Sequence, residues 1–157
     1  MNDPALQRLL DEQAIRALAA AYSDAVTHLD PVAAAAVYAE DGVVEIVGNA
    51  IAGRAAIQAG MRDSFAAFSL LQLIEHGGVV TFDGDRAQAR WSTVELAVRQ
   101  GQQALNVIFG RYEDELVRTP EGWRFARRRF TLAGRTQVET AKFQFNPAFF
   151  GPAFFGR

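Results

Sequence analysis

Residues 70–133 read LLQLIEHGGVVTFDGDRAQARWSTVELAVRQGQQALNVIFGRYEDELVRTPEGWRFARRRFTLA, and this stretch decides the class of fold. It contains four long apolar-rich runs that are typical of strands, at residues 70–82, 87–99, 104–117 and 123–133. Hairpin signals separate these runs: Asp83-Gly84-Asp85, Gln100-Gly101-Gln102 and Thr119-Pro120-Glu121-Gly122. Parallel pairing would need a helix-length crossover, and none lies between the runs. The stretch therefore predicts an antiparallel meander.

The residues before this stretch predict three helices and a small hairpin. Apolar side chains recur at three- and four-residue spacing from Leu6 through Leu9 and Leu10 to Leu29, behind an Asp3 cap. A second, alanine-rich helix is expected at residues 31–40, a hairpin at residues 43–52 and a third helix at residues 54–68. Helices first and a meander afterwards predict an α+β domain.

Length and composition limit the class of protein further. The chain has 157 residues, 18 acidic and 16 basic side chains, and half of its residues are apolar, which is typical of one soluble globular domain. The absence of cysteine excludes disulfides, thiolate nucleophiles and zinc or iron–sulfur sites built on cysteine. A pI near 5.7 argues against a general nucleic-acid binder. No targeting or membrane-spanning segment is recognisable, so we expect a cytoplasmic protein with neither a membrane nor a nucleic acid as partner.

The end of the chain, residues 141–157, forms an aromatic tail. Six of the twelve phenylalanines lie in the last fifteen residues, within a near-duplicated Pro-Ala-Phe-Phe-Gly unit. Such a segment needs cover from water. It either packs across the open edge of its own domain or onto a second subunit, or its rings wall a ligand cavity.

His76 is the first candidate for proton chemistry, because histidine titrates near neutral pH. It lies inside a predicted strand and precedes Gly77 and Gly78, which suggest a bulge. By alternation it shares a face with Ile74 and lies opposite to Glu75, and on the inner face of a curved sheet it would point into the concavity. A histidine satisfied by a backbone carbonyl is an equally good interpretation of the residues alone.

No cofactor or metal site is expected. Residues 48–53 contain glycines but lack the Gly-Lys-Ser/Thr ending of a phosphate-binding loop. The chain also has no serine-centred nucleophile elbow and no His/Asp pair at metal-ligand spacing. The candidate site is therefore a pocket that works without a cofactor.

The order of motifs resembles a known family. The sequence has a helix, an Asp-Pro helix, a Glu-Asp-Gly-Val-Val strand and a Gly-Arg-Ala-Ala-Ile helix. A His-bearing strand, Gly-Arg-Tyr-Glu-Asp-Glu-Leu-Val-Arg and Gly-Trp-Arg-Phe-Ala-Arg-Arg follow. This order is similar to the SnoaL-like group of the nuclear-transport-factor-two-like superfamily, near its scytalone dehydratase and hexachlorocyclohexane dehydrochlorinase branch. The resemblance spans roughly residues 6–136. It implies a cone-shaped α+β barrel, with three helices packed on a strongly curved, mixed and mostly antiparallel sheet that encloses a pocket.

The resemblance also implies catalytic residues. His76 matches the family's general base, and Tyr22 matches an assisting residue on the first helix. Thr27 occupies the position of the aspartate that orients the base, so the family's dyad is not intact. Glu95 could replace that aspartate from the neighbouring strand if it faces inward.

Arg128 matches an arginine that the family directs into the pocket, where it would bind a substrate carboxylate or stabilise a leaving group. Alternation places Arg128 with Phe130 on one face of the last strand and Phe125 on the other, so its direction stays open. Further possible pocket residues are Val26, Thr27, Tyr38, Trp91, Glu95 and Asn106.

Two functions follow from these residues. The first is a cofactor-independent lyase or isomerase, best matched by a dehydratase, which uses His76, Tyr22 and Arg128 on a small hydrophobic or aromatic ligand. The second is a non-catalytic ligand-binding protein or an accessory subunit such as the small subunit of a ring-hydroxylating dioxygenase. Either would self-associate as a homodimer or homotrimer through the convex side of the sheet.

Overall fold

The computed structural model describes residues 3–139. Its elements, in chain order, are α1 (Pro4–Thr27), α2 (Pro31–Ala36), β1 (Tyr38–Ile46), β2 (Asn49–Ala52), α3 (Arg54–Phe65), β3 (Phe68–Asp83), β4 (Arg86–Arg99), β5 (Ala104–Thr119) and β6 (Gly122–Glu139). The strands form one sheet in the order β2-β1-β6-β5-β4-β3. Neighbouring strands are antiparallel except for β1 and β6, which are parallel. The expected α+β class with a mixed, mostly antiparallel sheet is confirmed.

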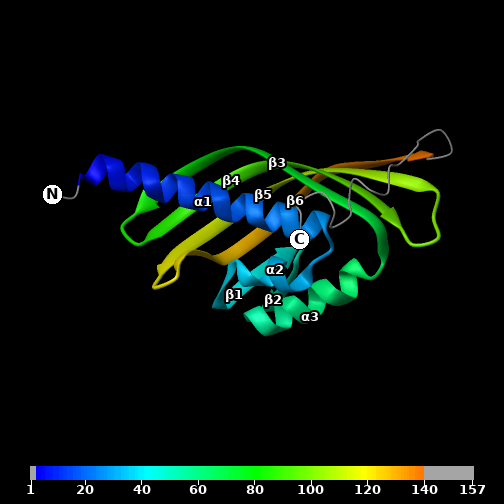
Figure 1. The fold of residues 1–157 in the computed structure, drawn as a ribbon. Coiled ribbons are helices and arrows are strands. Elements are labelled where there is room, and N and C mark those ends of the chain that lie inside the picture. Colours follow the sequence, from blue (N-terminus) through cyan, green and yellow to red (C-terminus); the bar gives the residue numbers. More distant parts are fainter. Residues whose placement is uncertain (1–2, 140–157) are drawn as a thin grey trace, which may run out of the picture.

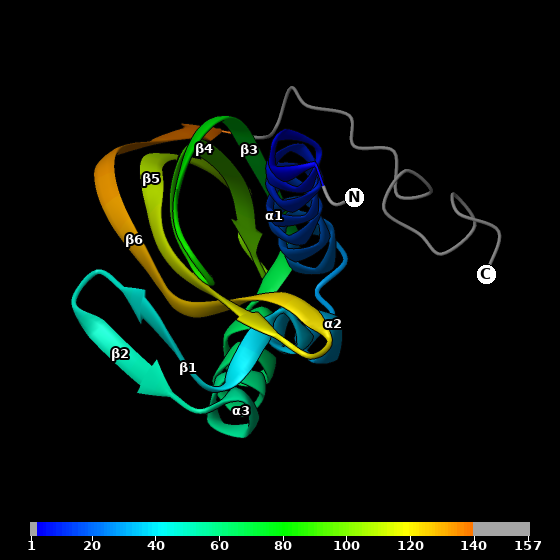
Figure 2. The same ribbon diagram turned by 90° about the vertical axis from the view of Figure 1, so that its left-hand side faces the viewer.

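The sheet bends around an interior that the helices close on one side. Figure 1 shows α1 running along the strands, and Figure 2 shows β3 to β6 curving beside it with α2 and α3 below. Within residues 3–139 the sheet is curved but does not close into the expected barrel, because β2 and β3 remain its edges. The core between α1 and the sheet is built on Ile15, Ala19, Tyr22 and Val26 from the helix.

The buried face of α1 differs from the sequence prediction in its first turns. Leu6, Leu9 and Leu10 are exposed, whereas Asp11 and Ile15 are buried. The polar Asp11 lies on the contact face because the strands offer it hydrogen-bond donors.

Tertiary pairing shortens two predicted helices. The second helix ends at Ala36 rather than near residue 40, because Tyr38 begins β1 and pairs with Phe125 of β6. The third ends at Phe65, and β3 begins at Phe68. Pairing along the sheet therefore overrides the helix propensity of the alanine-rich segment.

Two irregularities in the sheet set the direction of the candidate site residues. The predicted bulge after His76 is confirmed: the register shifts between His76 and Val79, and Gly77 and Gly78 both have positive φ. In β6 the register shifts so that Arg127 pairs with Glu115 but Phe125 pairs with Leu116. One residue of β6, Ala126, is therefore extra, so Phe125 and Arg128 lie on the same face although they are three positions apart.

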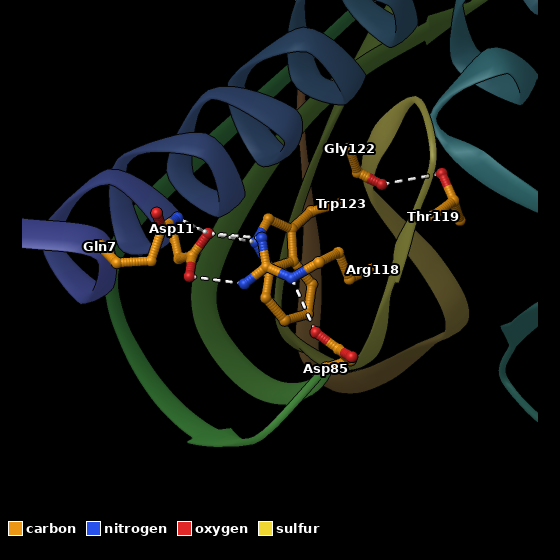
Figure 3. Close-up of polar contacts among 7 residues, drawn as sticks. All are labelled: Gln7, Asp11, Asp85, Arg118, Thr119, Gly122 and Trp123. Carbon is orange, nitrogen blue, oxygen red and sulfur yellow. Dashed lines mark hydrogen bonds and ion pairs between the residues drawn. The ribbon is translucent and has the colours of Figure 1, made fainter. Parts of the chain in front are cut away.

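An ionic cluster fastens α1 to the hairpins at one end of the sheet (Figure 3). The Arg118 guanidinium donates to both carboxylate oxygens of Asp11 at 2.8 and 2.6 Å and to Asp85 at 2.9 Å. The indole of Trp123 donates to Asp11 at 3.1 Å. Hydrogen bonds from Arg118 and Trp123 lower the pKa of Asp11 to about 2, against the opposing effect of burial.

The aromatic tail that the sequence assigns to residues 141–157 lies outside the described residues. Within residues 3–139, no helix is long and apolar enough to cross a membrane.

Candidate functional site

A buried arginine between two carboxylates forms the centre of the interior. Arg128 of β6 contacts Glu75 of β3 through Nη2 and Oε1, and its Nε lies 3.4 Å from Oδ1 of Asp114 on β5. The side chains of Arg128 and Asp114 are completely buried, and that of Glu75 is 5% exposed. Trp91 of β4 donates from its indole nitrogen to the other oxygen of Asp114 at 2.7 Å. Four strands thus contribute to one charged group in the core.

Aromatic rings surround the guanidinium of Arg128. Its central carbon lies 3.9 Å from the ring centre of Tyr112, 4.3 Å from that of Tyr22 and 4.5 Å from that of Phe125. Cation–π attraction to these rings offsets part of the cost of removing the charge from water. Arg128 therefore has both its charge and its planar faces matched by the protein.

Burial shifts the pKa of each carboxylate upward. It raises the pKa of Glu75 to about 7 and that of Asp114 to about 6, although Arg128 favours the charged forms of both. Burial acts to lower the pKa of Arg128, but Asp114 and Glu75 outweigh it and hold that pKa above the usual range. The cluster thus pairs a permanent cation with two acids that titrate near neutral pH, as proton transfer requires.

A cleft between α1 and the edge strand β3 reaches this cluster. Its volume is about 510 Å³, which is within the range of small-molecule sites. Glu75 lies in its wall together with mainly small or apolar side chains, and the lining residues are Arg16, Ala19, Ala20, Ser23, Leu73, Ile74, Glu75, His76, Gly77 and Trp91. Small residues on one side of α1 leave this space open.

Several buried polar atoms of the charged cluster lack a close hydrogen bond among the described residues, including Glu75 Oε2, Asp114 Oδ1 and Arg128 Nε and Nη1. Arg128 Nε and Asp114 Oδ1 still form an ion pair at 3.4 Å, and the Ser23 side chain acts on Glu75 to lower its pKa. A buried polar atom without a hydrogen bond is costly, so Glu75 Oε2 at the cleft wall is a place where water or a ligand group would be stabilised.

Arg16 holds the rim of the cleft. Its guanidinium donates to the carbonyl oxygens of Gly77 and Gly78 at 3.0 and 3.1 Å and pairs with Glu12 at 2.7 Å. Its central carbon lies 5.8 Å from the ring centre of Trp91. This contact ties α1 to the bulge of β3.

The interpretation that His76 points into the concavity is corrected by the structure. His76 is exposed and pairs with the exposed Ser92, whereas Glu75 pairs with the buried Thr93. Glu75 and His76 lie on opposite faces of the sheet, as the sequence indicates. The inner face, however, is the one that carries Leu71 and Leu73, and Glu75 lies on that face. His76 contributes only to the mouth of the cleft.

Arg128 points inward, and the expected alternation along β6 is wrong at Ala126. The extra residue there places Phe125, Arg128 and Phe130 together in the interior, while Arg127 and Arg129 both pair with Glu45 on the outer face.

Neither Thr27 nor Glu95 lies where it could orient His76 as the aspartate of the family dyad does. Thr27 Oγ1 accepts a hydrogen bond from the backbone nitrogen of Leu73 at 3.2 Å and so anchors the end of α1 to β3. Glu95 shares the inner face, opposite Leu73 and Ile108, and burial raises its pKa. It is not beside His76, because the two residues lie on opposite faces of the sheet.

The remaining predicted residues divide between the core and the far end of the sheet. Tyr22, Val26, Tyr38 and Trp91 are buried in the core. Asn106 lies away from the cluster and bridges strands, donating to the Ala97 carbonyl at 3.2 Å and accepting from Gln137 at 2.9 Å.

Sequence reasoning missed Glu75, Asp114 and Ser23 as site residues. The signal for both acids is alternation: Glu75 continues the series Leu71, Leu73, and Asp114 lies between Tyr112 and Leu116. Ser23 follows Tyr22 on α1 and gives no comparable signal.

Comparisons with known proteins agree on the fold. The chain is 30% identical to a nuclear-transport-factor-two-like protein with a cystatin-like fold from Novosphingobium aromaticivorans, with a TM-score of 0.70 over 85% of this chain and 92% of that one. A hexachlorocyclohexane dehydrochlorinase, LinA-type3, from Novosphingobium barchaimii is 16% identical, with a TM-score of 0.81 over 91% and 99% of the two chains. A protein from Novosphingobium aromaticivorans provisionally assigned as a scytalone dehydratase is 20% identical, with a TM-score of 0.77 over 84% and 90%.

Among curated proteins no significant match is found. The sequence model of the SnoaL-like domain matches residues 7–129, which include the cluster of Glu75, Asp114 and Arg128. Because this match covers most of the chain, the protein belongs to the SnoaL-like domain family, with the cone-shaped α+β fold of its structural neighbours.

Proposed function

We propose that this protein is a cofactor-independent lyase or isomerase for small molecules, with elimination of water from a β-hydroxy ketone as its best-matched reaction. The observation that carries the proposal is the carboxylate of Glu75, which lies in the wall of the cleft beside Ser23, with one oxygen held by Arg128. A carboxylate whose pKa is near 7 suits a general base at neutral pH. The dehydrochlorinase and dehydratase assignments of structural neighbours support the same reaction class.

The proposed chemistry needs only residues of this chain. Glu75 Oε2 removes a proton from the carbon next to the carbonyl group, and the electron pair forms the carbon–carbon double bond as the β-hydroxyl leaves. The proton taken by Glu75 is returned to that hydroxyl, so the products are an enone and water. Ser23, which lines the same cleft and acts on Glu75, would donate to the carbonyl oxygen through its hydroxyl. Arg128 and Asp114 act as positioning residues behind Glu75.

The structure favours Glu75 over His76 as the base. The base must lie where water is excluded from the reacting carbon, and Glu75 is buried whereas His76 is exposed at the rim. Tyr22 packs against Arg128 and supports it from α1.

The test is proton exchange and water loss in D2O, followed by proton NMR on small cyclic β-hydroxy ketones. Glu75→Gln is expected to slow both processes about 100-fold or more, the usual contribution of a general base, and His76→Ala about twofold or less. The opposite ranking would assign the base to His76, as the family resemblance implies. If the wild-type protein catalyses neither process with any such ketone, a non-catalytic ligand-binding role replaces the proposal.

A further inference from the structure

We infer that the cleft selects uncharged ligands that donate a hydrogen bond and rejects carboxylates, because each arginine at the site is already paired with acids of the same chain. This inference names the ligand class of the proposed function and rests on that cleft being the ligand site. It differs from the role that the family resemblance implies for Arg128, the capture of a substrate carboxylate.

The charge count at the cluster supports the inference. Arg128 has two carboxylate neighbours, Glu75 and Asp114, so the three side chains carry no net positive charge in any protonation state in which at least one acid is ionised. The guanidinium is also enclosed by aromatic rings and is completely buried. Of these three side chains only Glu75 lines the cleft, so an anionic ligand there would lie beside its carboxylate and be repelled by it.

The second cation at the cleft is engaged as well. Arg16 pairs with Glu12 and spends further donors on the carbonyl oxygens of Gly77 and Gly78. An anionic ligand would have to displace these contacts to reach it. His76 is the remaining basic residue that lines the cleft, and it is exposed.

The polar side chains in the cleft wall define what the ligand must offer. Glu75 Oε2 is buried in the cleft wall, and an ionised carboxylate oxygen can only accept hydrogen bonds. A hydroxyl group satisfies it, and the apolar part of the ligand can contact Ala19, Leu73 and Trp91. Ser23 Oγ, as donor or acceptor, can bind a second polar group.

Benzyl alcohol and benzoate form a matched pair of probes, because they share one ring and differ in charge. The chain has two tryptophans, so an amide spectrum with nitrogen-15 labelling shows two indole signals. Trp91 lines the cleft, and Trp123, which contacts Asp11, serves as an internal control. Titrations at pH 8 are expected to shift the Trp91 signal with benzyl alcohol at a dissociation constant at least tenfold lower than with benzoate.

Glu75→Gln should remove most of this selectivity by improving benzoate binding about tenfold, and Asp114→Asn should act in the same direction to a smaller extent. Glu115→Gln is the control, because it removes one charge from an exposed neighbour of Asp114 on the outer face. Thermal unfolding identifies any variant that fails to fold, and the two acid variants test the inference independently.

The outcomes separate the inference from the proposed function. Equal or tighter binding of benzoate by the wild-type protein overturns the inference and leaves the cleft as the ligand site. Unchanged selectivity in both folded acid variants also overturns it. A Trp91 signal that responds to neither probe overturns the ligand site, and with it both proposals.

Discussion

Arg128 is a buried residue on which the stability of the charged cluster depends. It is completely buried and contacts Glu75 and Asp114, which themselves have almost no exposed surface. Burying an ion pair costs desolvation energy, and the attraction between the charges roughly offsets that cost when the geometry is good. Removing one partner, however, leaves the others as uncompensated buried charges. The cluster is therefore a place where truncation is far more damaging than its net contribution suggests.

Replacing Arg128 with leucine is expected to lower the free energy of unfolding by about 3–5 kcal/mol, since two buried carboxylates lose their counter-charge. The measurement is urea denaturation near pH 7. Arg127→Leu is the matched control on the outer face, where the ion pair with Glu45 is partly exposed, and its loss should cost about 1 kcal/mol or less. Equal effects of the two substitutions would contradict the burial argument.

At the scale of elements, the bulge of β3 shapes the cleft. Gly78 has φ of +88°, and a Cβ atom at this position would collide with the indole ring of Trp91. The glycine therefore lets Trp91 lie against the bulge, with its nitrogen directed to Asp114. A side chain at position 78 would therefore displace Trp91 and disturb its hydrogen bond to Asp114 in the charged cluster.

Gly78→Ala should accordingly destabilise the protein by about 3 kcal/mol or more, combining backbone strain with the steric collision. Gly77→Ala is the control that isolates backbone strain. Gly77 has a similar φ of +79°, but a Cβ atom there would meet no other atom within 4 Å. Its replacement is expected to destabilise the protein by about 1–2 kcal/mol. Thermal unfolding measures both, and the Trp91 indole signal should move only in the Gly78 variant.

The junction of α1 with β3 depends on one side-chain hydrogen bond. Thr27 Oγ1 accepts from the Leu73 backbone nitrogen, which lies on an edge strand. Thr27→Val preserves the shape and removes the acceptor, so a loss of about 1 kcal/mol is expected. Hydrogen exchange at the Leu73 amide should speed up in the variant, and an unchanged rate would show that the bond does not hold this strand.

At the scale of the whole molecule, the ionic groups predict a stability that falls at both acid and neutral pH. Asp11 has a folded-state pKa of about 2, below its ordinary 3.8, so its stabilising effect is present above about pH 4 and is lost as the pH falls toward 2. Glu75 and Asp114 have folded-state pKa values raised to about 7 and 6. Their protonated forms favour folding, and this contribution is lost as the pH rises through 6 and 7.

Urea denaturation across pH 2.5–8 should therefore show greatest stability near pH 4–5. Asp11→Asn is expected to flatten the plot of stability against pH on its acid side. Asp114→Asn is expected to flatten it between pH 5 and pH 7. Each variant leaves the other side unchanged, so each controls for the other. A wild-type curve that rises from pH 5 to pH 8 would contradict the direction assigned to the two interior acids.

Much of the fold was predictable, because its signals are local. The four long strands, the hairpin at residues 43–52 and the glycine bulge after His76 follow from apolar runs and turn residues, and the structure contains all of them. The candidate site was less predictable. Alternation indicated that Glu75 and His76 lie on opposite faces, but the choice of inner face needed the packing of Leu71 and Leu73 against α1.

The sequence by itself determined the order of elements, the α+β class and the supply of ionisable groups, since these depend on spacing, turn chemistry and residue type. Only the tertiary structure decided which charges meet. The extra residue Ala126 in β6 turns Arg128 inward, and register across the sheet brings Glu75 and Asp114 to it from two other strands. Long-range register depends on how all six strands and α1 pack together, which no local pattern encodes.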